Sequence, residues 1–119
     1  GQAKDYGKAA MRDQPITPKL VTKIEVFLKT VSQHQDAKAF VFGHTHDPGL
    51  RWNGNKELLV ANCGSFLMDP ERSKDFVGTY VVIDNDPKLG AIDERIQVRI
   101  VTETKAEALF SKDKGIQSV

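Results

Sequence analysis

Residues 38–49 have the sequence KAFVFGHTHDPG, in which an apolar run leads directly into two histidines that are one residue apart. The continuous apolar run over residues 38–42 predicts a short central strand that is covered on both faces. The DPG sequence of residues 47–49 favours a turn, so we expect His44 and His46 to lie at the end of this strand. Side chains two residues apart in an extended chain point to the same side, about 6.5–7 Å apart along the strand. The two imidazoles are therefore predicted to project together.

The segment before this strand predicts an amphipathic helix. Thr17 can cap free N–H groups, and Pro18 suits the first helical position. The apolar residues that follow recur with a helical period, which places them on one stripe: Leu20, Val21, Ile24, Phe27, Leu28 and Val31. We expect this helix to end near His34 and to pack against a sheet.

A hairpin is predicted directly after the histidine pair. Residues 51–52 and 57–61 have strand character, and Asn53-Gly54-Asn55 between them is a strong turn signal because Asn and Gly tolerate positive φ. Residues 62–66 are predicted to form a loop that leaves the second strand. A charged connection follows at residues 68–75.

Two further strands are predicted, at residues 79–84 and 95–102, and apolar and polar residues alternate in the second of them. Strands in series favour an α+β fold with mainly antiparallel strands and one amphipathic helix packed on the sheet. The expected organisation is a loop or partly ordered leader over residues 1–16, a body over residues 17–104, and a polar tail over residues 105–119. We expect the tail to be a helical stub or disordered.

The composition gives no sign of a nucleic-acid-binding or membrane protein. The chain has 119 residues and a formal net charge of +1 at pH 7, with charges of both signs along its length. A nucleic-acid-binding domain would favour a basic face and a pI above about 9, and a membrane helix would need about 20 apolar residues in a row. The single cysteine, Cys63, cannot form an internal disulfide, which favours either a reducing compartment such as the cytoplasm or a fold that needs no disulfide.

The spacing of the two histidines leaves their role open. His44 and His46 could be polar loop residues that bond to water or backbone, or they could bind metal. Their separation suits a pair of metal ions about 3.5–4 Å apart, with one imidazole on each. A single ion bound by His44, His46 and a carboxylate is a further possibility.

Two segments together carry a resemblance to a known family. VFGHTHDPGL at residues 41–50 is followed, after the predicted hairpin, by LLVANCGSF at residues 58–66. This pair resembles the C-terminal signature of the calcineurin-like metallophosphoesterases, in which a Gly-His-x-His motif ends a core strand and an Asn-x-Gly-Ser loop follows a hairpin. Gly43-His44-Thr45-His46 matches the first motif, and Asn62-Cys63-Gly64-Ser65 matches the second. The resemblance covers roughly residues 17–103 and implies half of an α/β sandwich, which is the C-terminal half of a four-layer fold.

The resemblance implies a hydrolase that cleaves a phosphoester or phosphoanhydride by attack of a metal-bound hydroxide. His44 would bind one divalent metal ion and His46 the other, the ions being Mn, Fe, Zn or Ni. Asp47 could orient His46 by accepting its second ring N–H. Asn62 and Ser65 are expected to shape the site loop. The resemblance leaves the class of phosphorylated substrate undefined.

The sequence departs from the family in its missing motifs. The Asp-x-His, Gly-Asp-x-x-Asp and Gly-Asn-His-Asp/Glu motifs of the family's first half do not occur here. The first Met is Met11, so we expect the chain to be a processed product or a piece of a longer protein. The isolated chain is then expected to be inactive, with its other metal ligands on a missing N-terminal half or a partner chain. The alternative is a non-catalytic binding module that retains a phosphoesterase-like fold.

Overall fold

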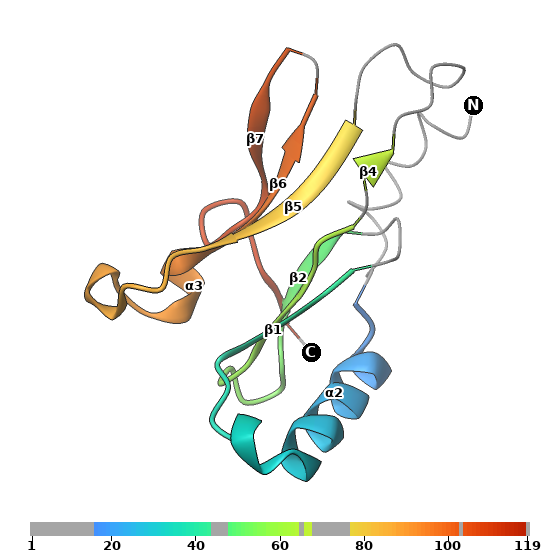
Figure 1. The fold of residues 1–119 in the computed structure, drawn as a ribbon, viewed down its shortest axis with the longest axis vertical. Coiled ribbons are helices and arrows are strands. Elements are labelled where there is room, and N and C mark those ends of the chain that lie inside the picture. Colours follow the sequence, from blue (N-terminus) through green and yellow to red (C-terminus); the bar gives the residue numbers. More distant parts are fainter. Residues whose placement is uncertain (1–15, 44–47, 65, 68–76, 103, 119) are drawn as a thin grey trace.

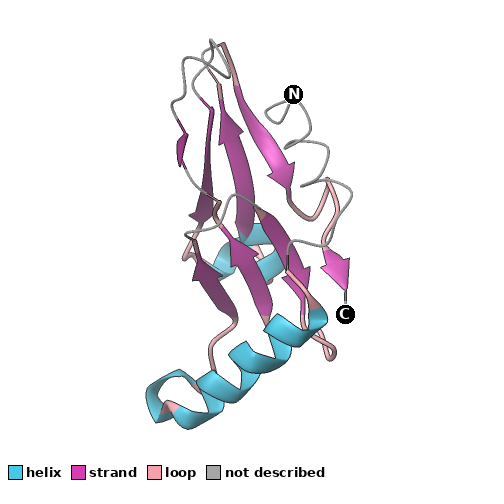
Figure 2. Cartoon of the chain, turned by 90° about the vertical axis from the view of Figure 1, so that its right-hand side faces the viewer, coloured by secondary structure: helices cyan, strands magenta, loops and turns pink. Residues whose placement is uncertain are grey.

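The computed structural model describes residues 16–43, 48–64, 66–67, 77–102 and 104–118 of the chain (Figure 1). These residues form a helix that packs on one face of a four-stranded sheet, sheet A, whose other face packs against a second four-stranded sheet, sheet B. Helix α2 (Pro18–Thr30) and the far end of the hairpin formed by β6 (Ile96–Val101) and β7 (Ala106–Phe110) lie at opposite ends of the molecule (Figures 1 and 2). This α+β architecture confirms the predicted fold class, and the four-layer arrangement stays a prediction.

Helix α2 (Pro18–Thr30) begins as its sequence predicts. The Oγ1 atom of Thr17 accepts a hydrogen bond from the Leu20 N–H at 3.1 Å, which caps the first turn. Three apolar side chains of the predicted stripe, Val21, Ile24 and Leu28, are buried against sheet A.

The predicted end of this helix is wrong by four residues. α2 ends at Thr30, Val31 is extended, and His34 lies in a separate 3-10 helix, η1 (Ser32–His34). The Thr30 hydroxyl donates to the Phe27 carbonyl at 2.7 Å, a local bond of the kind that competes with helix continuation. Residues 32–36, which follow Val31, are all polar and so do not continue the apolar stripe of the helix.

Sheet A has the strand order β1-β3-β2-β8, with β3 (Leu59–Asn62) at its centre. β3 runs parallel to β1 (Ala39–Phe42) and antiparallel to β2 (Gly49–Trp52), which confirms the predicted hairpin. Along β3 the side chains alternate between two cores. Val60 packs with α2, while Leu59 and Ala61 pack against sheet B.

The prediction that residues 38–42 form a central strand covered on both sides is wrong. Among the described strands β1 lies at the edge of sheet A, and the side chain of Val41 is 41% exposed. β3 is instead the strand that is buried on both faces. The apolar run showed that both faces of β1 are suited to burial, but it could not show whether neighbouring strands are present to cover them.

The β2–β3 turn also differs from the expected geometry. Positive φ falls on Lys56, at 57°, and not on Asn53 or Gly54. The Oδ1 atom of the buried Asn53 accepts hydrogen bonds from the N–H groups of Glu57 and Leu58, at 2.9 and 3.0 Å. This side chain therefore organises a longer loop, in place of a two-residue turn.

Sheet B has the order β4-β5-β6-β7 and is antiparallel throughout. Its strands are β4 (Phe66–Leu67), β5 (Val77–Ile83), β6 (Ile96–Val101) and β7 (Ala106–Phe110). β5 and β6 confirm the two predicted strands within two residues at their ends. Between them lie the 3-10 helix η2 (Pro87–Leu89) and the short helix α3 (Ile92–Arg95). Ile96 and Val98 are buried against sheet A, as the alternation predicts.

The expectation of a helical or disordered tail is wrong. β7 completes sheet B, and β8 (Gln117–Ser118) pairs in parallel with β2 in sheet A. The buried Arg51 guanidinium donates to the Ser118 carbonyl at 2.7 Å and thereby ties the end of the chain to β2. The tail needs only a few apolar residues, because only part of it, such as Phe110 and Ile116, contacts the core.

Candidate functional site

The two loops that carry the family-like motifs leave sheet A at the same end, where strands β1 and β3 finish. β1 ends at Phe42 and β3 ends at Asn62, and these two residues are directly in register. β2 begins at Gly49, which is also in register with Asn62. The Cys63 N–H donates to the Phe42 carbonyl at 2.8 Å, which extends the ladder one residue beyond the strand ends. The chain therefore enters the Gly-His-x-His segment beside the Asn-x-Gly-Ser loop.

Gly43 and Cys63 join the two loops by a close contact. A Cβ atom placed on Gly43 would lie 2.6 Å from the Cys63 Sγ and 3.5 Å from the Gly64 carbonyl oxygen. Carbon and sulfur atoms do not approach so closely, so a residue other than glycine at this position would force the Cys63 side chain to move. This contact gives the glycine of Gly-His-x-His a physical role that does not depend on any metal.

The second loop is shaped by its own asparagine. Asn62 is 1% exposed, and its Oδ1 accepts the Gly64 N–H at 2.9 Å. Gly64 has φ of 69°, and a Cβ there would collide with the side chain of Thr79 and lie 3.3 Å from the Pro48 Cβ. Asn62 and Gly64 therefore fix the path of this loop between β5 and the start of β2.

The remaining predicted site residues, His44, His46, Asp47 and Ser65, lie outside the described residues. In the part of the chain that the structure describes, no group of three or more His, Cys, Asp or Glu side chains could hold a metal ion. Cys63 thus belongs to no such group among the described residues. The proposed ligands remain His44 and His46, supplied by the segment between Gly43 and Pro48.

The third histidine lies away from this end of sheet A. His34 is exposed in η1, before the start of β1, whereas the first motif follows the end of that strand. The structure therefore does not bring His34 beside the two motif loops. His34 provides a matched histidine for control substitutions.

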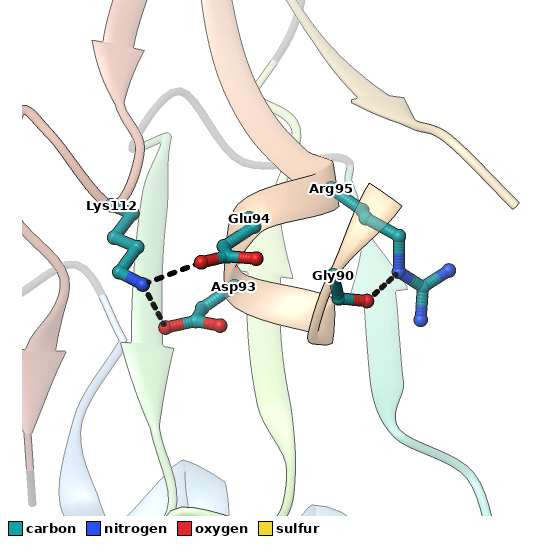
Figure 3. Close-up of polar contacts among 5 residues, drawn as sticks. All are labelled: Gly90, Asp93, Glu94, Arg95 and Lys112. Atoms are coloured by element: carbon teal, nitrogen blue, oxygen red, sulfur yellow. Dashed lines mark hydrogen bonds and ion pairs between the residues drawn. The ribbon is translucent and has the colours of Figure 1, made fainter. Parts of the chain in front are cut away.

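A second polar cluster lies at α3 and was not predicted from the sequence. Lys112 Nζ lies 2.9 Å from Glu94 Oε1 and 3.9 Å from Asp93 Oδ2 (Figure 3). The three residues line an open cavity of about 270 Å³. The hydrogen bond from Lys112, with its positive charge, holds the pKa of Glu94 below its ordinary value of 4.5. The same bond and the nearby carboxylates raise the pKa of Lys112 above 10.5.

This cluster was missed because the tail was not expected to fold back on α3. The structure shows α3 held by its last residue, since Arg95 Nε donates to the Gly90 carbonyl at 3.0 Å (Figure 3). Lys112 follows β7, whose pairing with β6 brings it to α3. The exposed ion pairs are of the kind that commonly supports surface structure.

Among the described helices, none is long and apolar enough to cross a membrane. Searches of protein-family models, curated proteins and solved structures found no match to this chain.

Proposed function

We propose that this chain is the C-terminal part of a two-metal phosphoesterase that hydrolyses a phosphoester or a phosphoanhydride. In this proposal His44 and His46 each contribute one imidazole ligand, and the other ligands come from polypeptide outside these residues. Two bound divalent ions would supply a water of lowered pKa and neutralise charge on the phosphoryl oxygens.

The observation that carries the proposal is the contact between two separate motifs at one end of sheet A. Nineteen residues of chain lie between Gly43 and Cys63, yet a Cβ on the first would collide with the sulfur of the second. The resemblance rests on both motifs. Their contact supports it, because two chance matches to the motifs would not be expected to lie side by side. Loops at the ends of strands in a rigid sheet commonly carry catalytic residues.

The described residues have positioning roles in this proposal. Gly43 lets the backbone of the first motif pass against the second loop, and Asn62 holds that loop in its turn. β1 fixes the direction from which the His44–His46 segment starts, because its pairing with the buried β3 is regular up to Phe42. None of these residues needs to touch a phosphoryl group.

Metal titration of the chain tests the ligand assignment. We expect Zn²⁺ or Ni²⁺ to bind weakly to the purified 119-residue chain, because a catalytic zinc site uses about three protein ligands. Binding measured by calorimetry should fall at least about tenfold in His44→Ala and in His46→Ala. The matched control His34→Ala should bind like the unsubstituted chain. Equal binding by all four proteins would remove the basis for the proposal.

Activity provides a second test of the proposal. The isolated chain should not hydrolyse a chromogenic phosphoester with Mn²⁺, since two imidazoles cannot hold a dinuclear centre. Clear metal-dependent turnover would contradict the claim that ligands are missing.

The sequence encoded upstream of Gly1 separates the proposal from the non-catalytic alternative. Asp-x-His and Gly-Asn-His motifs there would support the enzyme, and a start codon without them would favour the binding module.

A further inference from the structure

The outer edge of β1 has backbone groups available for strand pairing. The carbonyls of Lys38 and Phe42 accept N–H groups of Leu59 and Cys63 from the β3 side. Backbone groups alternate in direction along a strand, so the N–H and C=O of Val41 point away from β3. No described residue pairs with β1 on that side. A strand edge of this kind is a template for pairing with another chain.

Apolar side chains flank this edge on both faces of the sheet. On the α2 face, Phe27 is 51% exposed, and its ring packs edge-on against Phe40 with centroids 6.2 Å apart. On the opposite face, Val41 is 41% exposed. An occupant that covered both faces beside β1 would have to be an extended segment with apolar side chains on its two sides. A lone helix could cover one face only.

The segment that forms α2 and β1 carries an excess of positive charge, which argues against self-association. Residues 16–43 contain four lysines and two carboxylates. One carboxylate, Glu25, accepts a hydrogen bond from Asn53 on the β2–β3 loop at 3.1 Å. Lys23 lies one helical turn from Phe27, on the same side of α2. Pairing of two copies through β1 would place this basic surface against itself, because a two-fold interface brings the same patch together.

We propose that the outer edge of β1 pairs with a β-strand of a partner polypeptide that is apolar on both faces and carries acidic residues. The main-chain hydrogen bonds would come from the side of Val41, the apolar contacts from Phe27 and Val41, and the charge contacts from Lys23. This is strand addition to an open sheet edge, with specificity set by alternate side chains and by charge. It does not depend on the proposed phosphoesterase chemistry.

A labelled synthetic peptide tests this pairing on the purified chain. The probe is a peptide of about nine residues with a β-branched centre and Glu at both ends. Its fluorescence anisotropy should rise saturably with the chain. We expect Val41→Lys to weaken binding by about tenfold or more, since lysine on an edge strand opposes pairing. Phe27→Ser should weaken it severalfold. Both residues are exposed enough for the variants to fold, which thermal unfolding checks.

Val82 offers a matched control, because it is 44% exposed on strand β5 of the other sheet. Val82→Lys should leave peptide binding unchanged. A peptide with Lys at both ends should bind poorly to the unsubstituted chain and better to Lys23→Glu. The proposal is overturned if the acidic peptide does not bind saturably, or if Val82→Lys weakens it as much as Val41→Lys. It is also overturned if the chain forms a dimer that Val41→Lys converts to monomer, since the occupant is then a second copy.

Discussion

At the scale of single residues, the contact between Gly43 and Cys63 explains why the first motif begins with glycine. The Cys63 sulfur occupies the position that a side chain on residue 43 would need. This steric requirement can be tested without knowledge of the substrate or the metal.

Gly43→Ala should destabilise the chain by about 1–3 kcal/mol, because the new methyl group overpacks against Cys63. The same substitution should cost clearly less in a Cys63→Ala background, where the sulfur is absent. Chemical denaturation of the wild type, the two single variants and the double variant measures this coupling. Additive effects of the two substitutions would show that the contact does not form.

Sequence reasoning at this scale identified the motif residues but not their contacts. The Asn62 loop was expected to shape the site, and the Asn62–Gly64 hydrogen bond performs that structural task. Asn53-Gly54 was expected to supply positive φ, yet Lys56 supplies it. A dipeptide signal predicts that a turn exists, while side-chain bonds such as those from Asn53 decide its length.

At the scale of elements, the fold is predicted best where a segment carries its own periodicity. Val21, Ile24 and Leu28 of the stripe on α2 and the alternation in β6 face the cores as predicted, whereas Phe27 of the stripe is 51% exposed. β7 and β8 were missed because β7 has no β-branched residue and β8 is only two residues long, so each becomes a strand only through pairing with β6 or β2. The role of β1 was misjudged for a similar reason, since apolarity alone cannot distinguish a central strand from an open edge.

The tail is joined to α3 by Lys112, and this contact has a defined pH dependence. The pKa of Glu94 is lowered from 4.5, so its contribution to stability is present above that value and lost as the pH falls. The pKa of Lys112 is raised from 10.5, so its contribution is present below that value and lost as the pH rises. Lys112→Met should therefore lower the melting temperature most between about pH 6 and pH 9.

Thermal unfolding of Lys112→Met and the unsubstituted chain across the pH range checks this expectation. The difference should shrink below about pH 4 and above about pH 11. Lys88→Met removes the same charge from η2 and serves as the control. A deficit for Lys112→Met that stays constant at all pH values would show that the loss is one of packing and not of charge.

At the scale of the whole molecule, the sequence predicted one helix packed on a sheet and mainly antiparallel strands. The structure contains both, but the helix packs on sheet A, which is mixed, and sheet B is the antiparallel one. The strand patterns alone did not predict that the strands divide into two sheets around a shared core centred on β3, although the resemblance implied a layered sandwich. Long-range pairings such as β2 with β8 depend on residues far apart in the sequence, for which local patterns carry no signal. The two motifs were predicted to form one site, and their approach depends on the register of β1 with β3.

The most direct test of the proposed site is to locate a bound ion by paramagnetic relaxation. Mn²⁺ added in substoichiometric amounts to the ¹⁵N-labelled chain should broaden the amide signals of Gly43, Cys63 and Gly64 selectively. The broadening should disappear in the variant that carries both His44→Ala and His46→Ala. Selective broadening around Asp93, Glu94 and Asp113 instead, or broadening at Gly43 that survives the double substitution, would contradict the assignment of His44 and His46 as metal ligands.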